Sequence, residues 1–100
     1  MKQLNRLWHD VQKVHRGKIL SEKYNHLFES GLPKIAKKVG EEGVEIAVAA
    51  MSDEDQRDLV AMESADLLCY LTALWVELDI REEDIEEALL QAREKFDLPE

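Results

Sequence analysis

Apolar residues recur along most of this chain at the three- and four-residue spacing of amphipathic helices, and no segment alternates in the manner of a strand. The spacing predicts helices over residues 3–15, 32–51, 52–78 and 81–96. No internal repeat or low-complexity tract interrupts them. The sequence therefore predicts an all-α fold, a small helical bundle of four to five helices in one domain covering residues 1–100.

Residues at the expected helix ends support these bounds. Gly17 ends the first helix, and Pro33 suits the first turn of the second. Ser52 is the expected cap of the third helix, since its side chain can accept hydrogen bonds from the free N–H groups of a first turn. His9 and His15 lie off the apolar stripe of the first helix and are expected to face solvent.

The segment of residues 16–31 shows no sustained period. We expect an irregular connection there, with a short helical turn around residues 24–28. A long irregular segment in a small domain is often functional, although a plain connector is an equally good interpretation.

Residues 67–76 are apolar nearly all round the helix, which indicates burial on several sides. A chain of 100 residues buries only about two-thirds of its unfolded surface, so we expect a partner subunit to cover this helix. The last helix is expected to add a core stripe made of Ile85, Ala88, Leu89, Ala92 and Phe96.

The formal net charge of −9 argues against nucleic acid or an anionic membrane as the main partner. Cys69 is the single cysteine, so no intrachain disulfide can form, which fits a reducing compartment. The N-terminus lacks the apolar core of a signal peptide, and the longest apolar run falls well short of the ~20 residues that span a bilayer. We expect a cytoplasmic protein.

Two carboxylates interrupt the apolar seam of the third long helix. Glu63 lies on one helical stripe with Leu67 and Leu74, and Asp66 follows it by one turn. A carboxylate that loses water without gaining a partner is costly, so buried charges are normally paired or bound to a metal.

The preceding helix supplies a matching set, Glu41, Glu42 and Glu45. The short connection around Ser52 predicts antiparallel packing, which brings both sets to similar heights, with the site between the two helices. Clustered carboxylates repel unless a hard cation is bound, and Mg²⁺ (or Mn²⁺) fits best. Zn²⁺ fits poorly, and a di-iron site would need Glu-x-x-His motifs that this chain lacks.

Basic residues precede the acids on the same helix face. Lys34, Lys37 and Lys38 can hold the outer oxygens of a di- or triphosphate, and Glu41 is the candidate proton acceptor for an attacking water. The plainer alternative is that these Lys and Glu residues form ordinary surface ion pairs. Mid-helix Gly40 and Gly43 each cost about 1 kcal/mol relative to Ala, which suggests close approach by a neighbouring backbone or a ligand.

At these residues the sequence resembles a known family. GEEGVEIAVAA followed by ESADLLCYL is similar to the EExxE and ExxD motifs of all-α nucleoside-triphosphate pyrophosphohydrolases. Within that superfamily, LPKIAKKVGEEGVEIAVAA and VAMESADLLCYLTAL most resemble the phosphoribosyl-ATP pyrophosphohydrolases of histidine biosynthesis. The resemblance covers roughly residues 21–96, and the combined motif is more specific than either half.

The resemblance implies Mg²⁺-dependent hydrolysis between the α and β phosphates of a nucleotide by a homodimer with composite sites. It implies metal ligation by Glu42, Glu45, Glu63 and Asp66, with Glu41 assisting and with phosphate facing Lys37 and Lys38. Lys23-Tyr24-Asn25 stands where the family commonly has Ser-Tyr-Thr, and Cys69-Tyr70 where it often has Tyr-His. Tyr24, Asn25 and Tyr70 are therefore expected at the substrate.

Two alternatives stay open at this point. The chemistry can serve another substrate, an ordinary or damaged NTP or dNTP, as in a house-cleaning pyrophosphohydrolase. The changes at Lys23, Asn25 and Tyr70 also allow a non-catalytic helical dimerisation module that has kept the fold.

Overall fold

The computed structural model describes residues 1–99, which form five α-helices and contain no strand. The helices are α1 (Lys2–His15), α2 (Glu22–Ser30), α3 (Leu32–Ala50), α4 (Gln56–Glu77) and α5 (Glu82–Lys95). The predicted all-α class is confirmed. The observed α1, α3 and α5 lie close to their predicted bounds, whereas α4 begins later than predicted.

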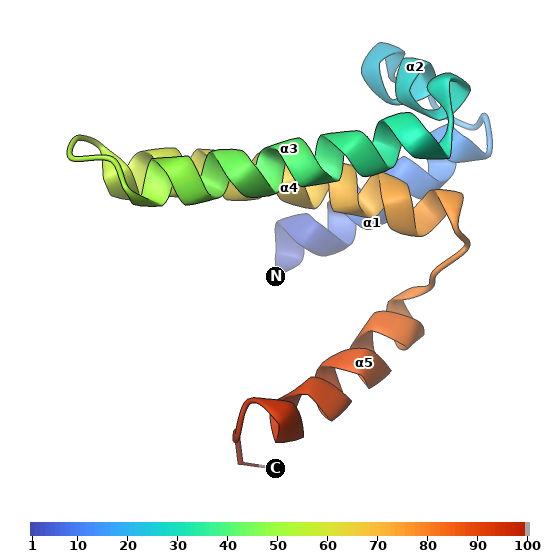
Figure 1. The fold of residues 1–100 in the computed structure, drawn as a ribbon. Coiled ribbons are helices and arrows are strands. Elements are labelled where there is room, and N and C mark those ends of the chain that lie inside the picture. Colours follow the sequence, from blue (N-terminus) through green and yellow to red (C-terminus); the bar gives the residue numbers. More distant parts are fainter. Residues whose placement is uncertain (100) are drawn as a thin grey trace.

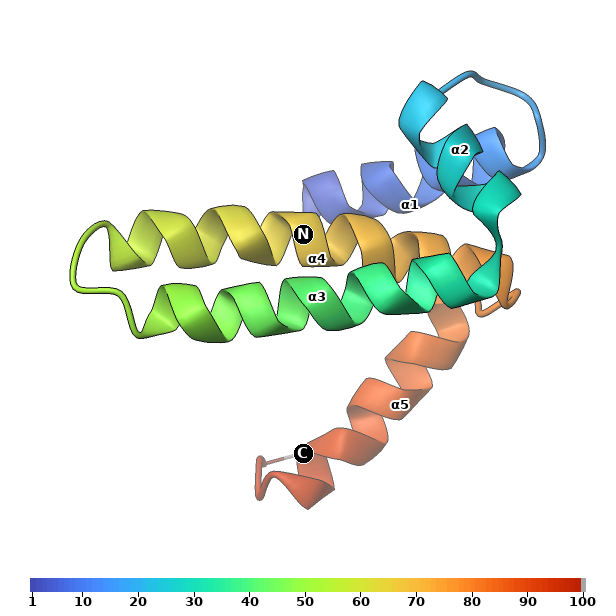
Figure 2. The same ribbon diagram turned by 45° about the horizontal axis from the view of Figure 1, so that its top comes forward.

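Helices α3 and α4 form a long antiparallel pair, as the short connection between them predicted (Figure 1). Helix α1 packs along α4, and α2 covers the end of the pair where α3 begins and α4 ends (Figure 2). The pair is therefore the frame of the molecule, and α2 closes one end of it.

Ser52 does not cap α4, so this prediction was wrong. Its Oγ accepts a hydrogen bond from the backbone N–H of Glu54 (3.3 Å) inside the turn. Helix α4 instead begins at Gln56, after Asp55 adopts a left-handed conformation with φ of 51°. The acidic residues between Ser52 and Asp55 thus build the turn rather than the first turn of the helix.

The segment expected to be irregular contains the nine-residue helix α2. Ser21 caps it, because Ser21 Oγ accepts from the N–H of Tyr24 (3.3 Å) while the N–H of Ser21 donates to Asn25 Oδ1 (3.1 Å). Gly31 ends the helix with φ of 88°, a backbone conformation that glycine adopts without strain. This paired capping stabilises a helix that is too short to show a clear period.

The buried core lies where α2, α3 and α4 meet. Leu27, Ile35 and Ala73 form its centre, and Ile35 and Ala73 are fully buried. The hydroxyl of Tyr24 donates to the backbone oxygen of Cys69 (2.9 Å) and fastens α2 to α4. Helix α2 is therefore anchored by packing and by a hydrogen bond.

A second contact joins α1 to α4. Trp8 is buried with its ring centroid 4.7 Å from that of Trp75. His15 lies at the exposed surface, in agreement with the prediction, and its Nε2 lies 3.3 Å from a carboxylate oxygen of Glu77 while its ring makes an edge contact with the ring of Phe28. His9 is exposed, as expected.

Helix α5 projects away from the other helices, and among residues 1–99 it packs against none of them (Figure 1). Its predicted core stripe is therefore exposed within the chain, with Leu89 57% and Phe96 70% accessible. The prediction was wrong because the turn after α4 directs α5 outward, which periodicity alone does not specify.

One face of α3 carries no charge and is also exposed. It consists of Gly40, Gly43, Val44, Ala47 and Val48, and Met51 continues it just beyond the end of the helix. Val44 and Val48 are 64% and 67% accessible, which is high for branched apolar side chains. Among the described residues nothing lies within 4 Å of a Cβ built on Gly40 or Gly43, so the expected close approach does not occur within the chain.

Helix α4 is long and apolar enough, by length and composition alone, to cross a membrane. This is weak evidence, because the core helix of a soluble protein passes the same test. Glu63 and Asp66 interrupt its apolar surface, and α3 packs along it. Of its residues only Thr72 and Ala73 are fully covered within one chain, so the expected burial on several sides is incomplete in the monomer.

Candidate active site

Three carboxylates meet between α3 and α4. Glu42 and Glu45 come from α3 and Glu63 from α4, and one oxygen from each lies within 4.8 Å of the others. The glutamates of α3 lie one turn apart, and the antiparallel packing brings Glu63 opposite them. The structure thus brings together three of the predicted metal ligands, referred to below as the acidic cluster.

Two oxygens of the acidic cluster lack a partner. Glu42 Oε2 and Glu63 Oε2 have no exposed surface and accept no hydrogen bond from the described residues. The pKa of Glu45 is raised, first because the neighbouring Glu63 carboxylate can accept a hydrogen bond from a protonated Glu45, and then by the Glu63 charge. The pKa of Glu63 is raised chiefly because the neighbouring Glu42 carboxylate can accept a hydrogen bond from a protonated Glu63. A cation bound by oxygen ligands would relieve both effects, so these residues fit a hard divalent metal.

Asp66 and Glu41 lie outside the acidic cluster. Asp66 is exposed one turn beyond Glu63, and its charge contributes to the raised pKa of Glu63. Glu41 is also exposed, with its oxygens 3.8 Å from Nζ of Lys38 and 4.0 Å from Nζ of Lys37. Such open ion pairs contribute at most about 1 kcal/mol each, so Glu41 is free to exchange partners when a ligand arrives.

A groove of about 660 Å³ runs between α2, α3 and α4, and its lining includes Asp66, one turn after Glu63, and Lys38, one turn before Glu42. It is lined by Glu22, Lys23, Tyr24, His26, Leu27, Ser30, Lys34, Lys38, Asp66, Cys69 and Tyr70. Of the three predicted phosphate-binding lysines, Lys34 and Lys38 line it and Lys37 does not. Cationic groups are thus concentrated in one groove of a chain with a net charge of −9.

The predicted substrate residues of α2 and α4 have different positions. Tyr24 and Tyr70 line the groove, but the Tyr24 hydroxyl is engaged with Cys69 and its pKa is raised, chiefly by burial. Tyr24 therefore offers its ring rather than a free hydroxyl. The side-chain oxygen of Asn25 accepts from Ser21, and Asn25 is not among the groove residues.

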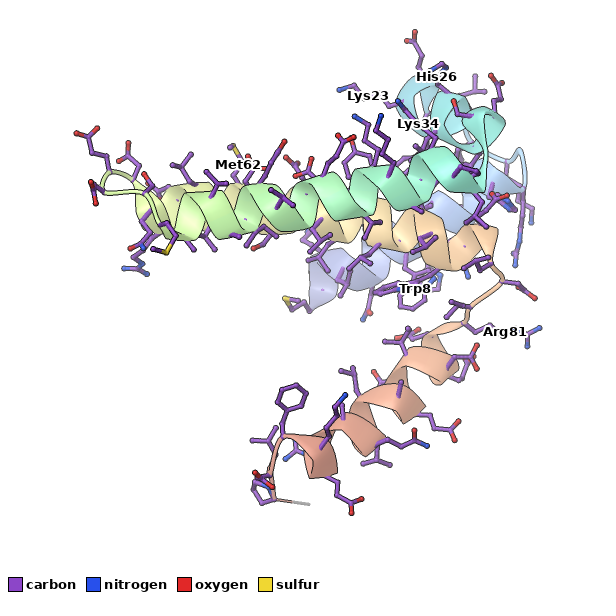
Figure 3. All side chains as sticks on the ribbon, viewed as in Figure 1. Trp8, Lys23, His26, Lys34, Met62 and Arg81 are labelled. Carbon is purple, nitrogen blue, oxygen red and sulfur yellow. The ribbon has the colours of Figure 1, made fainter. Side chains whose placement is uncertain are left out.

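Sequence reasoning missed Lys23, His26 and Ser30, which line the groove from one face of α2. Figure 3 shows Lys23 and His26 on α2 and Lys34 on α3 at the same end of the helix pair. Their three- and four-residue spacing is a helical signal that becomes readable once Ser21 and Gly31 are recognised as the ends of a helix.

Acid should weaken metal binding at the acidic cluster, because protons compete for Glu45 and Glu63, whose pKa values are raised. Without metal, the folded chain holds these protons to higher pH than the unfolded chain does. The free energy of unfolding should therefore fall as pH rises above the ordinary glutamate value of about 4.3. Thermal unfolding between about pH 5 and pH 8 tests both expectations: Tm in EDTA should fall as pH rises, and the increase in Tm caused by Mg²⁺ should grow. A metal-induced stabilisation that shrinks as pH rises would contradict it.

The sequence of this chain is similar to those of known proteins. Residues 8–93 match the family model described as phosphoribosyl-ATP pyrophosphohydrolase. The phosphoribosyl-ATP pyrophosphatase of Clostridium botulinum is 46% identical over 71 residues, 71% of this chain and 63% of the relative. That of Streptococcus gordonii is 43% identical over 70 residues, 70% of this chain and 64% of the relative.

A bifunctional relative matches a longer stretch of the chain. The histidine biosynthesis bifunctional protein HisIE of Caldanaerobacter subterraneus is 38% identical over 82 residues, 82% of this chain and 39% of that protein. The chain thus spans less than two thirds of the length of these curated relatives. No solved structure matches it significantly.

Proposed function

The chain belongs to the phosphoribosyl-ATP pyrophosphohydrolase family, and from this premise we propose that it hydrolyses phosphoribosyl-ATP between the α and β phosphates. The products are pyrophosphate and phosphoribosyl-AMP, a step of histidine biosynthesis. The observation that carries the proposal is the acidic cluster of Glu42, Glu45 and Glu63, one helical turn from Lys38 and Asp66, which line the groove.

Magnesium, with manganese as a substitute, is the proposed cofactor. Glu42, Glu45 and Glu63 would hold it, and Asp66 lies beside Glu63 to complete the set. When bound, the metal neutralises the carboxylates and withdraws charge from phosphoryl oxygens. The two partnerless carboxylate oxygens support this assignment, because burying them is costly without a cation.

The other residues of the groove orient the substrate. Lys38 lies one turn before Glu42 and can hold a phosphoryl oxygen next to the acidic cluster, whereas Lys34 lies one turn further away and faces another part of the substrate. Lys37 lies outside the groove and pairs with Glu41. A water oxygen forms a new bond to phosphorus while the bridging P–O bond breaks and pyrophosphate leaves. Glu41 is the proposed acceptor of the water proton.

The working unit is proposed to be a homodimer. The uncharged face of α3 and the apolar residues of α5 are exposed on one chain, and a second copy can cover both. Gly40 and Gly43 allow a partner helix to approach α3 closely, since open space surrounds them. The acidic cluster lies on the same helix, so the partner would border the site.

Replacing Val48 with glutamate should break this dimer, because a charge would be buried in the apolar interface. Light scattering during size exclusion should give twice 11.6 kDa for the unaltered chain and 11.6 kDa for Val48→Glu. Gln3→Glu adds the same charge to an exposed position of α1 and should leave the dimer intact. A monomeric mass for the unaltered chain at micromolar concentration would contradict the proposed dimer.

We propose that the reaction takes place in the cytoplasm. A panel of nucleotides tests which substrate the protein hydrolyses. Pyrophosphate release with Mg²⁺ is measured on phosphoribosyl-ATP, ATP and the four dNTPs. We expect the highest kcat/KM with phosphoribosyl-ATP. Preferred turnover of another nucleotide would replace histidine biosynthesis with nucleotide-pool cleansing. Absence of turnover together with absence of Mg²⁺ binding would support the non-catalytic module instead.

A further inference from the structure

The groove holds cations at two different distances from the acidic cluster. Lys38 precedes Glu42 by four residues, about 6 Å along α3, whereas Lys34 precedes it by eight residues, about 12 Å. Lys23 and His26 lie on α2 at the same end as Lys34 (Figure 3). The groove therefore has a near cation, Lys38, and a distal set formed by Lys23, His26 and Lys34.

The packing of α2 fixes the place of the distal set. Leu27, next to His26, packs on Ile35 and Ala73. Ile35 lies ten residues before Glu45, and Ala73 ten residues after Glu63, so both helices put this contact about 15 Å from the acidic cluster. A triphosphate held at the acidic cluster is too short to reach so far, whereas a nucleoside attached to it spans a comparable length.

Apolar and aromatic surface separates the two ends of the groove. Cys69 and Tyr70 line the groove and follow Glu63 on α4 by six and seven residues, about 9 to 10 Å, and the ring of Tyr24, whose hydroxyl is engaged with Cys69, lines the groove beside them. This lining suits a sugar or a base, which present apolar faces. The order of chemistry along the groove is thus carboxylates, one lysine, an apolar middle and a second group of cations.

The charges of the distal set are not neutralised by ion pairs. Within residues 1–99 no carboxylate oxygen lies within 4 Å of Nζ of Lys23 or Lys34, in contrast to Lys37 and Lys38. Glu22 also lines this part of the groove without an ion pair at that distance, so it only partly offsets the two lysines.

We infer that Lys23, His26 and Lys34 bind a second phosphate group, carried by the substrate at the end opposite its triphosphate. The inference rests on the proposed function, since phosphoribosyl-ATP carries its 5′-phosphate at that end. The distal set selects a nucleotide with phosphate at both ends over a plain NTP, which lacks a group to fill it. Lys23 belongs to the stretch in which this chain departs from the family motif, and His26 follows that stretch directly. Both residues are therefore assigned a role in substrate specificity.

Lys23→Gln and Lys34→Gln test the inference by kinetics. Each should raise the KM for phosphoribosyl-ATP about tenfold, as expected for loss of a charge-assisted hydrogen bond at an exposed site, with kcat changed less than about twofold. The inhibition constant of ATP should be unchanged, because ATP has no second phosphate there. Lys95→Gln on α5 is the matched control and should match the unaltered chain. Equal weakening toward phosphoribosyl-ATP and ATP would overturn the inference.

A binding experiment tests the distal phosphate site independently of the proposed reaction. Ribose 5-phosphate is titrated into the ¹⁵N-labelled protein in EDTA, where the acidic cluster repels phosphate. Resonances of Lys23, His26 and Lys34 should shift, Lys23→Gln should abolish the shift, and ribose should cause none. Absence of a shift would overturn the inference even if phosphoribosyl-ATP is hydrolysed. A shift in a protein that hydrolyses no nucleotide would support the distal site and reject the reaction.

Discussion

Replacing Glu45 with glutamine is expected to lower the rate of pyrophosphate release at least about a hundredfold while leaving the helices intact. Glu45 supplies one of the three oxygens that meet within 4.8 Å. A phosphate-bound metal stabilises the transition state by several kcal/mol, and each 1.36 kcal/mol corresponds to a factor of ten in rate. Initial rates at saturating phosphoribosyl-ATP, with circular dichroism as the check on folding, measure the effect.

The stability of Glu45→Gln distinguishes lost metal binding from lost folding. The substitution removes one of three mutually repelling carboxylates, so the Tm in EDTA should stay the same or rise. The rise in Tm caused by Mg²⁺ should disappear. Glu87→Gln, an exposed position on α5, is the control and should retain both activity and the Mg²⁺ effect. An active Glu45→Gln would contradict the assignment of the site.

Truncation of Ile35 to alanine should cost about 3 kcal/mol of unfolding free energy. Ile35 is fully buried and joins Leu27 and Ala73 at the meeting point of α2, α3 and α4. Loss of its side chain leaves a cavity beneath the groove, so α2 should loosen from the helix pair. Urea denaturation followed by circular dichroism, at one fixed protein concentration, measures the change.

Leu20→Ala serves as the control for that truncation. Leu20 is 94% accessible, so removing its side chain should change the unfolding free energy by less than about 0.5 kcal/mol. A similar small change for Ile35→Ala would mean that the contact of α2 with the helix pair contributes little to stability. That result would also mean that this contact does not hold α2 in the position that forms the groove.

The sequence was sufficient to predict the acidic cluster. Glu42 and Glu45 lie on one long helix and Glu63 on the next, and only a short connection joins the two. Such a connection favours antiparallel packing, and its length sets which turns of the two helices lie opposite each other. Carboxylates are costly in an apolar seam, so their presence there indicates the position of the site. Asp66 and Glu41 were predicted in the same way, but the structure leaves them at the edge of the cluster.

The groove could not be predicted by the same reasoning. It exists because α2 folds back across the helix pair, and that depends on capping by Ser21 and on the packing of Leu27. Neither produces a periodic signal in nine residues. The exposure of the apolar stripe of α5 was not predicted for a related reason. Apolar periodicity indicates a face that must be covered but does not identify what covers it.

Identification of the products by ³¹P NMR tests the central claim most directly. Phosphoribosyl-ATP is incubated with the protein in Mg²⁺, and the spectrum is followed over time. Hydrolysis between the α and β phosphates predicts pyrophosphate and phosphoribosyl-AMP in equal amounts, with no reaction in EDTA. Release of orthophosphate, which places the cut between the β and γ phosphates, or unchanged phosphoribosyl-ATP would contradict it.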